Sequence, residues 1–372
     1  MIIKNVKVFN ENGTFEPGEI YIQGENFAET SADDMVIDGN GAYAIPGLTD
    51  VHFHGCVGYD FCDGTEEAIK AMAEYELENG VTAICPATMT LAEDTLAGIA
   101  KAAAAYNSET GADLVGINME GPFISLEKKG AQNPAYIHKP AVDMFRRLQK
   151  ESNNLFKLCA IAPEEPGALE FIKELKDEVV LSVAHTTADY DMAKAAFEAG
   201  ARQVTHLYNA MPAFTHRAPG VIGAACDNDD VNVELICDGV HLHPSVIRTT
   251  FKMFTDDRII MISDSMMATG KPDGTYALGG QSVTVKGNLA TLTEGGAIAG
   301  SATNLMNCVR YAVKTAGIPL ESAVKCAAVN SAKAIGTYDK YGSITPGKYA
   351  NVVLLDEELN IQKVIKRGKI IK

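Results

Sequence analysis

The feature that most constrains the fold is an alternation of eight apolar, strand-like runs with helix-like segments along the middle of the chain. The runs cover residues 47–54, 82–89, 114–120, 156–162, 179–185, 203–207, 231–238 and 259–264. Strands that alternate with helical patterns are typical of βαβ units and a parallel sheet. Eight such units predict an α/β fold built on a (β/α)8, TIM-like barrel. The alternative is a doubly wound open sheet, but the phosphate-cradling Gly-x-Gly-x-x-Gly that would favour it is absent after the first run.

Both ends of the chain carry short alternating runs that are typical of antiparallel strands. They cover residues 2–9, 18–24 and 35–39 at the start, and 350–356 and 361–368 at the finish. Neither end has enough strands for a stable sheet of its own. We therefore predict one small β-sandwich domain, made of residues 1–45 and 340–372, beside a catalytic barrel of residues 46–339. Residues 276–298 predict a hairpin inserted after the eighth strand.

Charge and cysteine usage limit the partners and the compartment. The 372 residues have a net charge of −16, which disfavours nucleic acid and anionic membranes as partners. The first residues alternate like a strand and do not match a signal peptide. The eight cysteines have no Cys-x-x-Cys spacing, so we expect reduced thiols in a cytoplasmic protein.

Side chains that can bind metal or move protons end six of the eight predicted strands. They are His52 and His54, Glu120, His185, His206, His241 and Asp264. A single such residue at a strand end usually has a structural role, such as a helix cap or a turn. In a parallel barrel, however, all these strand ends meet at one rim, where active sites lie. The set as a whole therefore predicts a metal centre.

The ligand types indicate the chemistry. Imidazole and carboxylate ligands without thiolates suit Zn²⁺, Fe²⁺, Mn²⁺ or Co²⁺. Such a cation lowers the pKa of bound water to about 7 and so creates a hydroxide nucleophile at neutral pH. Asp264 can take the proton of that water and pass it to a leaving amine, and His241 can hydrogen-bond a carbonyl oxygen as it becomes negative. These roles predict the hydrolysis of an amide.

Several motifs resemble the amidohydrolase superfamily. These are Pro-Gly-Leu-Thr-Asp-Val-His-Phe-His at 46–54, the strand-five and strand-six histidines, the strand-eight aspartate and the closing segment 342–353. Segments 119–123, 128–134, 205–212, 216–223 and 238–241 resemble, more narrowly, its family of N-acetylglucosamine-6-phosphate deacetylases. The resemblance runs along essentially the whole chain, and Thr-His-Leu-Tyr-Asn-Ala-Met at 205–211 is its most specific motif.

The resemblance implies a role for each matching residue. Glu120, His185 and His206 would hold the principal metal, Zn or Fe, and Asp264 would be the general base and acid. His52 and His54 match the branch that can carry a second ion. Asn209, the Ala210 backbone and Arg217 would hold the sugar phosphate, with Arg217 reaching into the neighbouring subunit of a homodimer, while His241 would polarise the acetyl carbonyl. The implied substrate is a small phosphorylated amino sugar, N-acetylglucosamine 6-phosphate.

One position departs from the family pattern. The family commonly has histidine where this chain has Gln132, at a position that faces the sugar in relatives. Glutamine can donate and accept a hydrogen bond but cannot carry a proton, so N-acetylgalactosamine 6-phosphate is an alternative substrate. Two further alternatives are an amidohydrolase for a cyclic amide or an acylated amino acid, and a catalytically silent binding relative.

Overall fold

The computed structural model describes residues 1–32, 35–107 and 110–372. Its centre is built from parallel strands in two sheets, ordered β11-β9-β6 and β10-β12-β13-β14-β15-β16-β17. The strands are β6 (Leu48–Asp50), β9 (Val81–Ile84), β10 (Ala87–Thr88), β11 (Asp113–Leu114), β12 (Ile117–Met119), β13 (Phe156–Ile161), β14 (Val180–Val183), β15 (Gln203–Val204), β16 (Asn232–Ile236) and β17 (Ile259–Ile262). Each of the eight predicted runs contains at least one of them.

The second and third predicted runs are each divided into two short strands, which separates the parallel strands into two sheets. Pro86 lies between β9 and β10 and has no N–H to donate to a neighbouring strand. Gly116 lies between β11 and β12, where an added Cβ would be 2.5 Å from Cγ of Lys157 and 2.9 Å from Sγ of Cys85. Pro86 and the closely packed Gly116 therefore interrupt the strand pairing in two neighbouring runs, between β9 and β10 and between β11 and β12.

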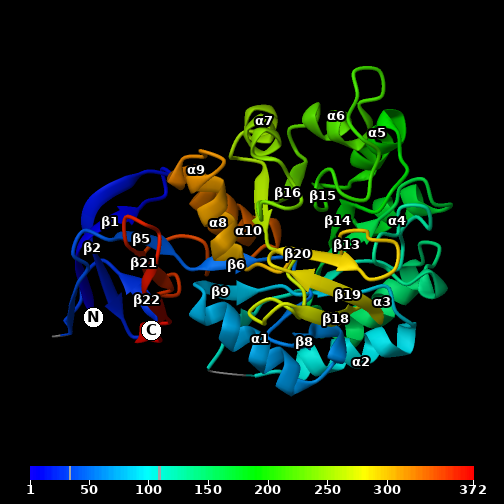
Figure 1. Ribbon diagram of the computed structural model, residues 1–372. Coiled ribbons are helices and arrows are strands. Elements are labelled where there is room, and N and C mark those ends of the chain that lie inside the picture. The colour runs from blue at the N-terminus through cyan, green and yellow to red at the C-terminus, as the bar shows by residue number, and fades with distance from the viewer. Residues whose placement is uncertain (33–34, 108–109) are drawn as a thin grey trace.

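Helices follow most of the parallel strands and surround them (Figure 1). They are α1 (Glu66–Glu78), α2 (Glu93–Ala105), α3 (Val142–Glu151), α4 (Ala168–Leu175), α5 (Tyr190–Ala199), α6 (Gly220–Cys226), α7 (Pro244–Phe254), α8 (Leu305–Lys314), α9 (Leu320–Val324) and α10 (Asn330–Ala334). Two single 3-10 turns, Phe61–Asp63 and Pro134–Tyr136, and one π-helical turn, Lys325–Val329, complete the helical segments. The predicted α/β class, with parallel strands and intervening helices, is confirmed.

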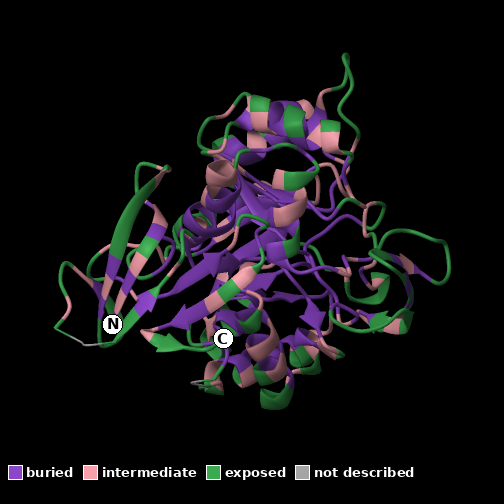
Figure 2. Cartoon of the chain, turned by 60° about the vertical axis from the view of Figure 1, so that its left-hand side comes forward, coloured by how far each residue is buried: buried purple, intermediate pink, exposed green. Residues whose placement is uncertain are grey.

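Burial follows the strand–helix alternation. Figure 2 shows the central strands as almost continuously buried, whereas the surrounding helices expose one side. In α3, for example, Met144, Phe145 and Leu148 are buried, while Arg146 and Arg147 point to solvent and pair with acidic residues. The largest apolar cluster lies between these helices and the parallel strands. It gives the strand ends a rigid base.

Strands from the two ends of the chain lie in one mixed eight-stranded sheet, seen at the left of Figure 1. Its members are β1 (Ile2–Phe9), β2 (Phe15–Gln23), β3 (Asn26–Ala28), β4 (Val36–Asp38), β5 (Tyr43–Pro46), β21 (Val352–Leu355), β22 (Ile361–Lys366) and β23 (Lys369–Ile370). The two ends meet where β21 pairs antiparallel with β5, with Leu354 opposite Ala44. A separate apolar cluster that includes Ile3, Ile20 and Ile365 covers this sheet.

The segment after β17 differs from the predicted hairpin because it contains two turns. Strands β18 (Gly274–Leu278), β19 (Gln281–Lys286) and β20 (Leu289–Leu292) form a three-stranded antiparallel sheet. Gly279 and Gly280 make the first turn and Gly287 lies in the second, all with positive φ angles that glycine adopts without strain. This sheet lies at one side of the cavity described below.

No helix in the described part of the chain is both long and apolar enough to cross a membrane. All eight cysteines are free thiols, and six of them are buried.

Candidate metal centre

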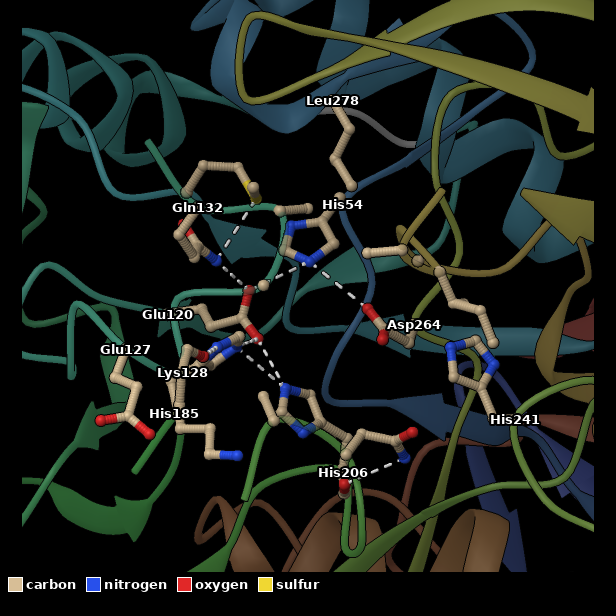
Figure 3. Close-up of a pocket in the computed structure, with 18 residues that line it drawn as sticks. His54, Glu120, Glu127, Lys128, Gln132, His185, His206, His241, Asp264 and Leu278 are labelled. Carbon is tan, nitrogen blue, oxygen red and sulfur yellow. Dashed lines mark hydrogen bonds and ion pairs between the residues drawn. The ribbon is translucent and has the colours of Figure 1, made fainter. Parts of the chain in front are cut away.

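Four imidazole rings surround one buried carboxylate at the carboxyl ends of the parallel strands, and Figure 3 shows three of them, His54, His185 and His206, around Glu120. Oε1 of Glu120, which follows β12, lies 3.1 Å from Nε2 of His206, 3.2 Å from Nε2 of His185 and 3.3 Å from Nε2 of His52. Oε2 of the same carboxylate lies 3.3 Å from Nε2 of His54. The groups that the sequence places at separate strand ends are therefore brought together.

Two overlapping triads in this cluster have their ligand atoms close enough to share an ion. They are Glu120, His185 and His206, and His52, His54 and Glu120, and all five residues are buried. In the first triad, the two histidine Nε2 atoms are 3.1 Å apart, and each is 3.1–3.2 Å from the carboxylate oxygen. A tetrahedral site with bonds of about 2.0–2.1 Å has edges of about 3.3 Å. The residues therefore fit a divalent metal ion.

The pKa shifts of the side chains in this cluster are also those expected of a cation site. Burial alone would lower the pKa of His54, but hydrogen bonds to Asp264 and Glu120 outweigh it and raise that pKa to about 10. Burial alone would raise the pKa of Glu120, yet His52, His185 and His206 hold it well below its usual range. The carboxylates are therefore ionised and stabilise protonated imidazoles next to them. A divalent cation can supply the same positive charge in place of the imidazole protons.

Three of these strand-end residues have backbone conformations that are rare outside glycine. The φ angles are +43° for His185, +27° for His206 and +49° for Asp264. Such conformations cost on the order of 1–3 kcal/mol each and are found mainly where the surrounding structure holds a functional side chain in place. The chain turns sharply at the end of each strand, and this turn directs the side chain to the shared centre.

Asp264 and His241 lie on the same side of the centre, opposite His185 (Figure 3). Oδ1 of Asp264 is 3.4 Å from Nε2 of His54 and 3.7 Å from Nε2 of His52. Nδ1 of His241 donates to Oδ2 of Asp238 at 2.7 Å, and Asp238 also accepts from the His241 backbone N–H. This contact leaves Nε2 of His241 as the ring atom that can face a ligand.

A cavity of about 370 Å³ opens next to the centre, a volume within the range of small-molecule sites. Its polar side includes His54, Glu120, His185, His206, His241 and Asp264. Its apolar side includes Leu278 of β18 and Ile298, which follows β20. Glu127 and Lys128 also line it, although neither was predicted from the sequence. The backbone oxygen of Lys128 accepts a hydrogen bond from Nδ1 of His185 at 2.8 Å, which orients that ring.

Gln132 lines the same cavity, but its polar atoms are already engaged. Nε2 donates to Oε2 of Glu120 at 2.6 Å, and Oε1 accepts from the Thr90 backbone N–H at 2.6 Å. Nε2 also donates to Sδ of Met89 at 3.6 Å, so both amide hydrogens have a partner. The side chain therefore contacts the metal-site carboxylate directly, a contact that the sequence did not indicate.

The predicted phosphate-binding residues are divided between the cavity and the surface. Asn209 and Ala210 line the cavity, and Ala210 has a φ of +53°. Arg217 is exposed on the loop before α6 and is not among the described residues that line the cavity. Phe214, on the same loop, is 50% exposed.

Comparisons with known proteins agree with this geometry. The N-acetylglucosamine-6-phosphate deacetylase of Bacillus subtilis (strain 168) is 34% identical, over 100% of this chain and 96% of that protein. The N-acetylgalactosamine-6-phosphate deacetylase of Escherichia coli O157:H7 is 33% identical, over 87% of this chain and 86% of that protein. The crystal structure of N-acetyl-D-glucosamine-6-phosphate deacetylase from Mycobacterium smegmatis superposes with a TM-score of 0.92 at 30% identity and covers 100% of both chains. Residues 43–371 match the amidohydrolase family, and the chain belongs to that family.

Proposed function

We propose that this protein removes the acetyl group of N-acetylglucosamine 6-phosphate, giving glucosamine 6-phosphate and acetate. The observation that carries the proposal is the convergence of Glu120, His185 and His206 beside Asp264 at the wall of one cavity. Full-length similarity to a deacetylase of that sugar phosphate supports the choice of substrate. An amide bond placed in the cavity would lie within reach of both the cation site and Asp264.

Glu120, His185 and His206 would hold the principal ion, and His52, His54 and Glu120 a second one. The nitrogen and oxygen donor set suits Zn²⁺ or Fe²⁺. When bound, such a cation supplies Lewis acidity, which polarises a carbonyl oxygen and lowers the pKa of water to about 7.

Asp264 acts as the general base and then the general acid. Its carboxylate is buried at the cavity wall, and its pKa is lowered because the hydrogen bond to His54 and the charges of His52 and His54 outweigh the effect of burial. It can accept a proton from the attacking water and return it to the leaving amine. Burial alone would lower the pKa of His241, but Asp238 and Asp264 outweigh it and raise that pKa, so the ring can carry a proton on both nitrogens. While Nδ1 donates to Asp238, Nε2 can then donate to the acetyl oxygen as negative charge develops there.

The sugar phosphate would be bound by Asn209, the Ala210 backbone and an arginine from a second copy of the chain. Arg217 is exposed beside Phe214, as a residue that serves a neighbouring subunit would be. The planar guanidinium can bind two phosphate oxygens at once. We therefore propose a homodimer in which Arg217 of each subunit completes the site of the other.

We also propose that the two parallel sheets are parts of one (β/α)8 barrel, residues 46–339, and that residues 1–45 and 340–372 form a small β-sandwich domain. Hydrogen bonds from the Asp264 backbone N–H to the His52 oxygen at 2.9 Å, and from the His54 N–H to the Ser265 oxygen at 2.7 Å, support closure between the first and eighth strands. A cytoplasmic location is supported by the eight free thiols.

Acetate release by the purified, metal-loaded protein tests the proposal. We expect kcat/KM for N-acetylglucosamine 6-phosphate to exceed that for unphosphorylated N-acetylglucosamine by at least about 100-fold, since a charge-assisted contact contributes about 1.5–3 kcal/mol and a bidentate pair more. Arg217→Ala should remove most of this preference while leaving the rate with the unphosphorylated sugar unchanged. Equal rates with the two sugars would refute the phosphate site.

N-acetylgalactosamine 6-phosphate is a second candidate substrate. Gln132 stands at the position where the family commonly has histidine, and a deacetylase of the galacto sugar is 33% identical to this chain. Kinetics with both epimers under the same conditions decide between them. A kcat/KM more than tenfold higher for the galacto sugar would replace the first proposal.

A further inference from the structure

We propose that Glu234, a residue behind the metal centre, is a positioning residue that fixes the ring of His52 and determines which of its nitrogens is available to a cation. The inference concerns the proposed metal site, but it does not depend on which sugar the enzyme deacetylates. Glu234 lies on β16, between β15 and β17, and does not line the cavity among the described residues.

The Glu234 side chain is completely buried, with 0% exposure. Its neighbours along the strand, Val233 and Leu235, are also fully buried and apolar. Within the described ranges, no lysine or arginine forms an ion pair with it, and His52 is its one charged or chargeable partner. Burying a carboxylate costs free energy unless hydrogen bonds or an opposite charge compensate it. The contacts of Glu234 therefore show what this carboxylate does in the fold.

Three N–H groups point to this carboxylate. Oε1 accepts from Nε2 of Gln203 at 2.6 Å, and Oε2 accepts from the backbone N–H of His206 at 3.1 Å. Oε2 also lies 2.8 Å from Nδ1 of His52. An amide nitrogen can only donate, so Gln203 and His206 make both carboxylate oxygens acceptors and hold them in place.

The third contact selects the tautomer of His52. A carboxylate oxygen accepts, so Nδ1 of His52 carries the hydrogen and donates it. In the neutral ring that can bind a cation, Nε2 is then the atom with a lone pair. It makes no hydrogen bond within the described residues and lies 3.3 Å from Oε1 of Glu120. A carboxylate behind a histidine in this way both orients the ring and increases its basicity as a metal ligand.

The other histidines of the centre have weaker support or none. Nδ1 of His185 is held by the Lys128 backbone oxygen. Nδ1 atoms of His54 and His206 are buried and have no hydrogen-bond partner among the described residues. Only His52, of the four, is backed by a carboxylate in the described part of the chain. Loss of Glu234 should therefore act on cation binding through His52.

Glu234→Gln tests this assignment because glutamine has almost the same shape but only one acceptor oxygen. Its single acceptor oxygen carries no charge, so His52 either loses its acceptor or donates to a neutral amide that supports the basicity of the ring less. We expect the affinity for Zn²⁺ to fall about 10–100-fold, measured by competition with a chelating dye together with the number of ions bound per chain. Glu76→Gln, the same substitution at another fully buried glutamate, is the control and should bind Zn²⁺ like the wild type.

A second arm distinguishes positioning of His52 from general damage to the core. In a His52→Gln background, Glu234→Gln should change Zn²⁺ affinity by less than about threefold, because the two residues act as one unit. Should Glu234→Gln fail to fold, Glu234→Asp, which keeps the charge but is one methylene shorter, replaces it with the same expectation. Wild-type affinity in the Glu234 variant, or an undiminished loss in the His52→Gln background, would overturn the inference.

These measurements use no sugar, so a protein that binds Zn²⁺ as expected but releases no acetate would contradict the proposed function alone.

Discussion

Glu120 and Glu76 are both fully or almost fully buried, yet their surroundings are opposite. Four imidazole nitrogens and one amide lie around the oxygens of Glu120, and its pKa is well below the usual range. Neither oxygen of Glu76, on α1, has a hydrogen-bond partner among the described residues. Burial, together with the nearby Asp50, raises its pKa well above the usual range.

The difference shows that burial alone does not identify a functional carboxylate. A buried acid without partners takes up a proton and becomes neutral. A buried acid surrounded by imidazoles remains charged and can exchange their protons for a metal ion. Asp50 lies between these cases: it accepts hydrogen bonds from Ser263 and the His52 backbone N–H, yet burial raises its pKa to about 7, whereas the pKa of Asp264 is lowered.

The strongest test of this contrast is Glu120→Gln. The substitution removes the carboxylate that both triads share, so we expect bound metal to be lost and deacetylation to fall by more than about 10⁴-fold, the upper range of an acid–base contribution alone. Metal analysis and acetate release measure the two effects. Retention of wild-type metal content would show that Glu120 is not a ligand.

Asp264→Asn should have the next largest effect. The variant keeps the shape of the side chain but cannot accept the proton of the attacking water, so kcat should fall about 10²–10⁴-fold. The principal triad does not include Asp264, and its metal should remain bound. A kcat within tenfold of the wild type would remove Asp264 from the proton-transfer role.

Removal of the metal tests whether the imidazole–carboxylate cluster depends on a cation. Binding to the folded state alone stabilises a protein by about 2.7 kcal/mol when the free ligand is 100 times its Kd. Zn²⁺ should therefore raise the free energy of unfolding of the chelated protein by about this amount, as measured by urea denaturation. Glu120→Gln should show no such gain, and a gain in that variant would place the ion elsewhere.

Glu76→Gln should have the smallest effect, and one that depends on pH. The pKa of Glu76 is higher in the folded than in the unfolded state, so the folded state binds the extra proton and stability falls as pH rises above about 4.5, the usual value for glutamate. The glutamine variant has no such proton to lose, so its free energy of unfolding should fall less steeply with pH than that of the wild type. The two slopes should differ by about 1 kcal/mol per pH unit between pH 6 and pH 8.

Urea denaturation at several pH values measures this slope. Glu78→Gln, an exposed residue on the same helix, should keep the slope of the wild type. An unchanged slope in Glu76→Gln would mean that Glu76 is ionised in the folded protein, and the contrast with Glu120 would then fail.

The sequence predicts the parallel strands and the groups at their ends because both have local signals. An apolar run followed directly by a histidine, glutamate or aspartate marks where a strand stops and which side chain it presents. The broken second and third strands could also have been anticipated, because Pro86 and Gly116 stand inside those runs. The two turns of the β18–β20 sheet are likewise marked by glycines.

The supporting residues of the site could not be predicted in this way. Glu234 lies within a strand, between apolar residues, and its role depends on contacts with Gln203 on β15 and with His52, which follows β6. The contact between Gln132 and Glu120 depends on how a loop folds over the centre. Neither arrangement has a signature in the order of neighbouring residues, because each is set by the tertiary packing.

The pairing of β5 with β21 has a consequence for the order in which the molecule can be assembled. β5 leads within two residues into β6, the strand before His52, and its partner is more than 300 positions later in the chain. At about 5–20 residues per second, a ribosome takes on the order of 15–60 s to cover that distance. Throughout this interval the edge of β5 that β21 will cover is unpaired, so it is open to pairing with other chains until β21 has been made.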